Sequence, residues 1–267
     1  MLFGDKEIDL VYSFQSAAET DDILILPRMS KKVKFIINSI ILENNWKEWI
    51  DSSASNDPPP DFYSDKFHLM MDVMRVDDHE RKGRKGKLFN PYKSHERDLY
   101  HEIKNKSHFD ESSNVNIVIN GITDLPSYQD HNYIFYKNNF KRVVQNHINS
   151  IPIYKNNHPG FKTIFLIYDE SSAYYQAPYD IEPKRQRIAG EITRGDLHRY
   201  YLDSAFLNVF LNCHIDYIIW FTPYKLYNIC QPVPKKMLIP SISVFDISKK
   251  HFMQKKYNEK RMESLEI

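Results

Sequence analysis

The stretch that decides the fold is PPPDFYSDKFHLMMDV, residues 58–73. Its three consecutive prolines end any regular structure that precedes them. The runs that follow, at 61–64 and 67–76, predict the two strands of a β-hairpin, with turn residues at 64–66 between them. Each strand carries one aspartate, so the first question is whether the hairpin brings the two side chains together.

If the loop of the hairpin comprises residues 65–68, Ser64 pairs with Leu69 and Asp61 lies directly opposite Asp72. Directly opposed residues have Cβ atoms roughly 4.5–5.5 Å apart. Two carboxylates that close repel each other unless a cation lies between them or one takes up a proton. Mg²⁺ binds paired carboxylates and waters and would supply the missing charge. With a two-residue loop the pair would instead be offset. The structural alternative is that Asp61 ends the proline loop and Asp72 binds an arginine or the backbone.

Helices and strands alternate around the hairpin. Ser30 is a candidate N-cap for a helix over 30–46, and 46–50 either extends this helix or forms a brief strand. A second amphipathic helix is predicted over 130–151. The apolar run at 161–170 is typical of a strand that is covered on both faces. The remaining expected elements are an exposed charged loop at 77–87, a helix near 94–106, strands at 115–120 and 215–223, and a helix over 195–213 with Asp196 as its cap.

This order of elements predicts an α/β fold in which helices flank a central mixed β-sheet. We expect one domain over residues 1–247, with a charged insertion near 77–114. Residues 248–267 are expected to form a charged helix or a tail.

The order of these elements resembles the PD-(D/E)XK nuclease-like superfamily. It runs from a helix to a Pro-Asp at a strand start, a short hairpin, an acid in the next strand, a second helix and a buried strand. Pro60-Asp61 matches the first half of the motif, and Asp72-Val73-Met74 aligns with the second. The resemblance implies a restriction-endonuclease-like core and acids that hold Mg²⁺, or Mn²⁺ in its place. It also implies hydrolysis of DNA or RNA phosphodiesters. Glu43 is the candidate for the acid that the family carries on its first helix.

The sequence departs from the family at Met74, which stands where the motif lysine belongs. A thioether cannot donate a hydrogen bond or carry charge. In this superfamily the lysine can move to another element, and Lys141 or Lys137 in the second helix could replace it. Two alternatives therefore stay open: an inactive nuclease scaffold that binds nucleic acid or a protein partner, and an unrelated α/β domain.

Two further groups of side chains are candidate sites. Asp77, Asp78 and His79, with His95 and His101 nearby, could form an oxygen and imidazole metal site, or could simply be solvated. Asp169 and Glu170 end a buried strand, where α/β proteins often bind ligands. The alternative is a strand end that turns into solvent.

Basic clusters bear on the nucleic-acid hypothesis. Residues 81–87, residues 184–187, and the group Lys137, Lys141 and Arg142 could contact phosphates, or could serve only solubility. Tyr174 and Tyr175 could stack on unpaired bases.

Composition limits the classes of protein. The 36 basic and 35 acidic side chains give a net charge of +1, so any attraction for nucleic acid must be local. Only 7 glycines occur, with no phosphate-binding glycine motif, and the 2 cysteines argue against disulfide scaffolds and cysteine-rich zinc sites. The sequence shows no signal peptide and no long apolar run, which predicts a cytoplasmic protein without a membrane span.

Overall fold

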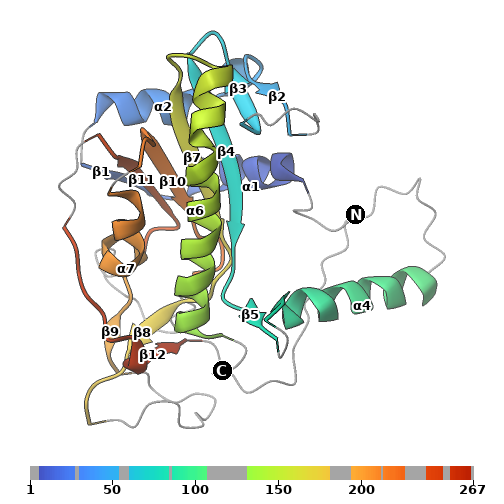
Figure 1. Ribbon diagram of the computed structural model, residues 1–267, viewed down its shortest axis with the longest axis vertical. Helices are drawn as coiled ribbons and strands as arrows, with labels where there is room; N and C mark the ends of the chain where they lie inside the picture. Colours follow the sequence, from blue (N-terminus) through green and yellow to red (C-terminus); the bar gives the residue numbers. More distant parts are fainter. Residues whose placement is uncertain are drawn as a thin grey trace.

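The central sheet has seven strands. The computed structural model describes residues 6–27, 30–53, 60–83, 86–106, 131–180, 194–211, 213–225, 239–248 and 253–265 (Figure 1). The spatial order of the strands is β1 (Ile23–Leu26), β11 (Ile242–Asp246), β10 (Tyr217–Phe221), β7 (Lys162–Asp169), β4 (Leu69–Val76), β3 (Phe62–Ser64) and β2 (Ile50–Asp51).

The sheet is mixed, as predicted. β7 lies between β4 and β10 and is parallel to both, and β1 is parallel to β11. In contrast, β10 pairs antiparallel with β11, and β2, β3 and β4 form an antiparallel meander at the other edge. The α/β class with a central mixed sheet flanked by helices is therefore confirmed.

Helices cover both faces of this sheet (Figure 1). α6 (Tyr133–Asn157) and the short α7 (Ser204–Leu207) contribute to the apolar cluster on one face. α1 (Glu7–Thr20) and α2 (Lys31–Ile41) contribute to the cluster on the other face.

The side chains of β4 alternate between these two layers. Met70 and Met74 join the cluster on the α6 side, whereas Met71 and Val73 join the cluster under α1 and α2. Because successive side chains of a strand point to opposite faces, Asp72 shares the α6 side with Met70 and Met74. The alternation of side chains along β4 therefore places Asp72 beneath α6.

The first predicted helix begins where the sequence indicates. Ser30 accepts a hydrogen bond from the N–H of Val33 at 3.4 Å and caps α2. The predicted helix over 30–46 is divided between α2 and α3 (Glu43–Trp46). The stretch 46–50 neither extends the helix nor forms a strand of its own: α3 ends at Trp46, a turn follows, and β2 begins at Ile50.

The second predicted helix, over 130–151, is α6. Asn132 caps it, because its side chain accepts hydrogen bonds from the N–H groups of Ile134 at 2.9 Å and Phe135 at 3.3 Å. The helix continues past the predicted end and contains Pro152.

The helix predicted over 195–213 with Asp196 as its cap is wrong. Asp196 instead belongs to β9 (Asp196–Leu197), which pairs with β8 (Tyr174–Gln176), so the chain is extended where the helix was expected to begin. Asp203 is the cap that forms: it accepts from the N–H of Ala205 at 2.8 Å and starts α7. The short 3-10 turns η1 (Tyr200–Leu202) and η2 (Asn208–Phe210) precede and follow α7.

The charged helix or tail predicted at 248–267 is also corrected where the structure describes it. β12 (Met262–Ser264) pairs antiparallel with β8, so this segment completes a second sheet of order β12-β8-β9. η4 (Glu259–Arg261) leads into β12.

Within the predicted loop at 77–87, β5 (Arg81–Lys82) pairs with β6 (Leu88–Phe89) in a small hairpin. Gly86 has a φ of 73°, a conformation that favours glycine, and lies in the turn between them.

The remaining predicted elements are found in part. α4 (Pro91–Lys106) corresponds to the helix expected near 94–106, and β7 and β10 to the strands at 161–170 and 215–223. The strand predicted at 115–120 lies outside the described residues. Among the helices that the structure describes, none is both long and apolar enough to span a bilayer.

Candidate functional site

The hairpin has the register that opposes its two acids. Ser64 pairs with Leu69 and Phe62 pairs with Met71, so Asp61, one residue before β3, lies opposite Asp72. The four-residue loop that this register requires is therefore present.

Asp72 is buried and bound by α6. It is 2% exposed, and its Oδ2 lies 2.5 Å from Nδ1 of His147 and accepts a hydrogen bond from the Tyr154 hydroxyl at 3.1 Å. These partners differ from the arginine or backbone group of the structural alternative. His147 lies on the buried face that the helical periodicity predicts, so the sequence did signal a histidine directed toward the sheet.

Asp61 is half-buried and accepts a hydrogen bond from the N–H of Val73 at 2.7 Å. Burial, and then the charge of Asp72, raise the pKa of Asp61 to about 8 although the Val73 bond opposes the shift. The charge of Glu7, in the first turn of α1, raises it further. The hairpin thus holds two carboxyl groups that favour either a shared proton or a cation.

Glu43 and Lys141 lie elsewhere. The Glu43 side chain is 82% exposed and forms an ion pair with Lys47 at 2.7 Å. Lys141 is exposed on α6, six residues before His147, or about 9 Å along the helix axis. Met74 is 2% exposed within the apolar cluster under α6.

The structure therefore brings Asp61 and Asp72 together and adds His147, Tyr154 and Glu7 to their surroundings. Glu7 replaces Glu43 as the helix-borne acid whose charge reaches the pair. Nothing in its local sequence indicates this role, because only the docking of α1 beside β4 brings it there.

A second polar cluster lies beyond the end of β4. Asp78 is fully buried, with His131 Nδ1 3.3 Å from each of its carboxylate oxygens and His79 Nε2 3.5 Å from Oδ1. Burial alone would raise the pKa of Asp78, but His131, His79 and the Tyr174 hydroxyl outweigh it and lower this pKa well below its usual range.

The predicted grouping of this cluster is thus corrected in part. Among the described residues, the three whose ligand atoms lie within 4.8 Å of one another are Asp78, His79 and His131. Asp77 instead binds the local backbone: its Oδ1 accepts hydrogen bonds from the N–H groups of His79 at 3.1 Å and Glu80 at 3.0 Å.

The acids at the end of β7 are bound by basic and aromatic side chains. Asp169 is fully buried, and its Oδ2 accepts from Tyr136 at 2.5 Å, Trp220 at 2.8 Å and Lys225 at 2.9 Å. Glu170 forms a two-bond ion pair with Arg75 of β4. Both acids therefore have structural roles rather than the solvated strand end that was the alternative.

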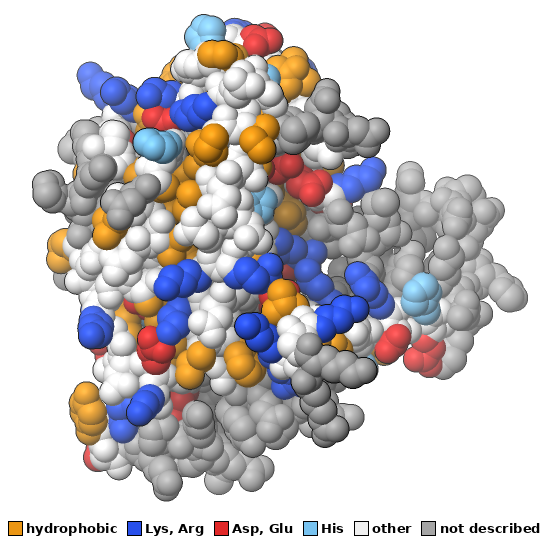
Figure 2. Space-filling model, viewed as in Figure 1, with side chains coloured by type: hydrophobic (Ala, Val, Ile, Leu, Met, Phe, Trp, Pro, Cys, Tyr) orange, Lys and Arg blue, Asp and Glu red, His pale blue; other side chains and the backbone are white. Residues whose placement is uncertain are grey.

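Of the basic clusters predicted to contact nucleic acid, the group on α6 lies within the described residues. Figure 2 shows Lys and Arg side chains in a band across the middle of the face that α6 crosses. Within this helix, Lys137 pairs with Glu259 and Arg142 with Glu80, each at 2.5 Å, so part of the positive charge is compensated. The cluster at 184–187 lies outside the described residues.

The stacking role of the paired tyrosines is wrong. Tyr174 is 1% exposed and donates to Asp78, and Tyr175 is 6% exposed and donates to Glu263 at 2.6 Å. Neither ring face is available to a base.

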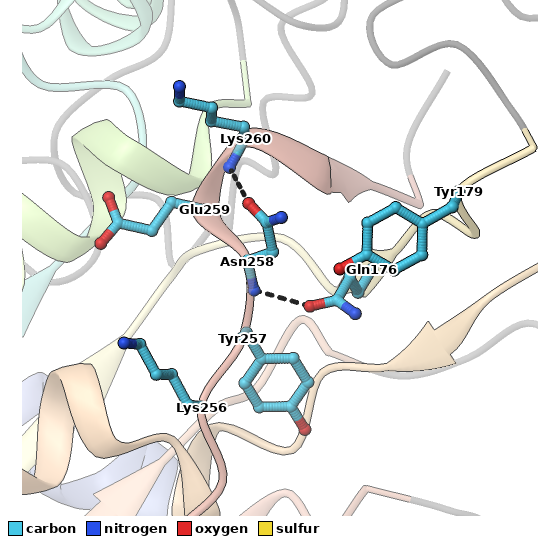
Figure 3. A pocket seen from close by; sticks show the side chains of 7 residues that line it. All are labelled: Gln176, Tyr179, Lys256, Tyr257, Asn258, Glu259 and Lys260. Carbon is cyan, nitrogen blue, oxygen red and sulfur yellow. Dashed lines mark hydrogen bonds between the residues drawn. The ribbon is translucent and has the colours of Figure 1, made fainter.

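A surface pocket of about 530 Å³ lies between the end of β8 and the segment before β12 (Figure 3). Asn258 joins its two sides by donating its N–H to the Gln176 side chain at 2.6 Å. Tyr179 on its rim is 80% exposed. In Figure 1, β8 and β12 lie at the end of α6 opposite to the hairpin, so this pocket is separate from the paired acids.

Comparisons of the chain with protein-family models, with curated proteins and with solved structures found no match.

Proposed function

We propose that this chain is a metal-dependent nuclease-like protein, with Asp61 and Asp72 as the metal-binding acids and nucleic acid phosphodiesters as substrate. The observation that carries the proposal is the pair of opposed carboxyl groups in the hairpin, one of them with its pKa raised to about 8. A buried Asp72 beside a half-buried Asp61, with added negative charge from Glu7, favours a cation.

The donor set suits a hard divalent ion. Carboxylate oxygens are the ligands that Mg²⁺ and Mn²⁺ prefer, and Asp61 and Asp72 supply them from adjacent strands. Such an ion lowers the pKa of a bound water and neutralises charge that develops on a phosphate. The protein's own part is orientation: His147 and Tyr154 fix the Asp72 carboxylate, and the Val73 N–H fixes Asp61.

The order of elements adds support. α2, the hairpin β3–β4, α6 and β7 follow one another in the order on which the resemblance to the PD-(D/E)XK superfamily rests, and β4 and β7 are parallel neighbours. The restriction-endonuclease-like core is part of this proposal. The band of basic side chains over α6 is the expected contact for a phosphate backbone (Figure 2).

A specific observation favours a second function, binding without cleavage. Met74 packs in the apolar cluster, and within the described ranges no lysine contacts Asp61 or Asp72. Exposed Lys141 is a candidate for phosphate contact but not for the motif lysine in this arrangement.

A thermal titration with Mg²⁺ and Mn²⁺ tests the proposal without requiring activity. A ligand of the folded state stabilises it by about 2.7 kcal/mol at a hundredfold excess over Kd. We expect this rise in the wild type and its loss in Asp72→Asn. The matched control is Asp65→Asn, which removes an exposed acid from the same hairpin and should keep the response.

Cleavage of labelled single- and double-stranded DNA and RNA then separates the two functions. Metal-dependent cleavage that Asp72→Asn abolishes supports the nuclease. If metal raises the melting temperature and the protein binds nucleic acid without cleaving it, the result supports the binding protein. If neither Mg²⁺ nor Mn²⁺ changes the melting temperature of the wild type, the metal site is contradicted.

A further inference from the structure

The cluster formed by Asp78, His79 and His131 is distinct from the hairpin acids. Asp78 lies two residues beyond the end of β4, six residues after Asp72, which corresponds to about 20 Å along an extended chain. His131 lies two residues before the start of α6, whereas His147 lies well within that helix. The cluster therefore needs its own explanation.

We propose that Asp78, His79 and His131 bind one divalent transition-metal ion of the Zn²⁺ class. Three protein ligands are the number found in zinc sites that keep a position for water or substrate. Imidazole nitrogens select such metals over Mg²⁺, so this site and the hairpin differ in the ion they take. The inference does not depend on the proposed nuclease function.

The distances between the ligand atoms are compatible with a common ion. Tetrahedral ligands at 2.0–2.1 Å from zinc lie about 3.3–3.4 Å apart. The observed separations from Asp78 Oδ1 are 3.3 Å to His131 Nδ1 and 3.5 Å to His79 Nε2. Typical N–H···O bonds are shorter, about 2.9–3.0 Å.

The Asp78 carboxylate is also held by protein donors through its second oxygen. Oδ2 accepts hydrogen bonds from the Ser172 N–H and the Ser172 hydroxyl, both at 3.0 Å, and from the Tyr174 hydroxyl at 2.5 Å. These three donors hold the carboxylate beside the two imidazoles, with His131 Nδ1 3.3 Å from each of its oxygens and His79 Nε2 3.5 Å from Oδ1. Outer-shell partners of this kind orient ligating carboxylates in metal sites.

The imidazoles are also positioned. The ring of His79 stacks on Tyr92 of α4, with 4.8 Å between ring centroids and 11° between planes. The side chains of His79 and His131 are 8% and 14% exposed, so neither imidazole is fully enclosed. The fully buried charge of Asp78 would gain a cation as its partner.

Co²⁺ is the probe, because with few ligands it absorbs visible light strongly, unlike the hydrated ion. We expect the chelator-stripped full chain to bind one equivalent with a new visible band, and Zn²⁺ to displace it. His131→Ala should weaken binding by more than about a hundredfold, since losing an outer-shell partner alone costs 10–100-fold. Tyr174→Phe tests that outer shell and should weaken binding about tenfold or more.

The matched control is His214→Ala, which removes an exposed imidazole and should leave the band unchanged. Circular dichroism checks folding, and His79→Gln replaces His131→Ala if the latter does not fold. Asp72→Asn should also retain the Co²⁺ band, which keeps this test separate from that of the hairpin. Absence of a band in the wild type, equal binding in the histidine variants, or loss of the band in Asp72→Asn overturns the proposal.

Discussion

Asp61 is unusual because a second carboxyl group, rather than a cation, is its close charged neighbour. Its pKa, raised to about 8, means that the folded protein keeps a proton there that the unfolded chain releases near pH 4. A raised pKa contributes stability that is complete below the unfolded value and is lost as pH rises through the folded value.

We therefore expect the free energy of unfolding to fall between about pH 4 and about pH 8 in metal-free buffer. Because the two carboxyl groups interact, they titrate as a pair, and the titration of Asp61 supplies part of this fall. Asp61→Asn cannot titrate, so urea unfolding at both ends of this window should show a smaller loss in the variant. Equal losses in both proteins would contradict the assignment.

Lys225 is a buried cation whose role is structural. It is 3% exposed, and its Nζ lies 2.9 Å from Asp169 Oδ2. Lys225→Met leaves Asp169 without its ion-pair partner, and removal of one member of a buried pair typically costs about 3–5 kcal/mol. Denaturant titration should show this loss, whereas Lys66→Met, in an exposed pair with Glu48, should cost below about 1 kcal/mol. Similar losses in the two variants would show that burial of the pair has no effect.

At the scale of elements, α6 links the two candidate sites, with His131 just before its start and His147 and Tyr154 toward its end. Asn132→Ala removes the cap and should cost about 1 kcal/mol of unfolding free energy. Asn149→Ala makes the same change at an exposed interior position of α6, where alanine is the better helix former, so it should be neutral or slightly stabilising. Chemical denaturation compares the two, and an equal effect would argue against the cap.

The elements that the sequence predicts well are those that local patterns define. The hairpin follows from proline and turn residues, although the sequence left its register open between two loop lengths. α2 and α6 follow from capping residues and helical periodicity. β12 has three residues, and its partner β8 is far away in the chain, so no local pattern reveals it. The failed helix over 195–213 has the same cause, because the pairing of Leu197 with Tyr175 overrides a locally helical pattern.

At the scale of the whole molecule, the sites join segments that are distant in sequence. His131 and Asp78 are separated by 53 positions, Ser172 and Asp78 by 94, and Lys225 and Asp169 by 56. The sequence could predict the pairing of Asp61 and Asp72 for a four-residue loop, because one hairpin carries both. It could not predict His131 or Glu7, because their contacts depend on how α6 and α1 dock on the sheet.

The separation of the two sites has a measurable consequence. Substitutions more than about 7–10 Å apart usually add within about 0.5 kcal/mol. We expect the unfolding free energies of Asp72→Asn and His131→Ala, measured without metal, to add in the double variant. A coupling well above that limit would mean that α6 transmits strain between its ends.

The most direct test of a metal-binding hairpin is an anomalous difference map from crystals grown with Mn²⁺. A peak within ligand distance of the Asp61 and Asp72 carboxylates, about 2.0–2.2 Å, is the expected result. A map with no peak there, even if the Asp78 cluster is occupied, would contradict the site and leave Asp61 and Asp72 as acids that share a proton.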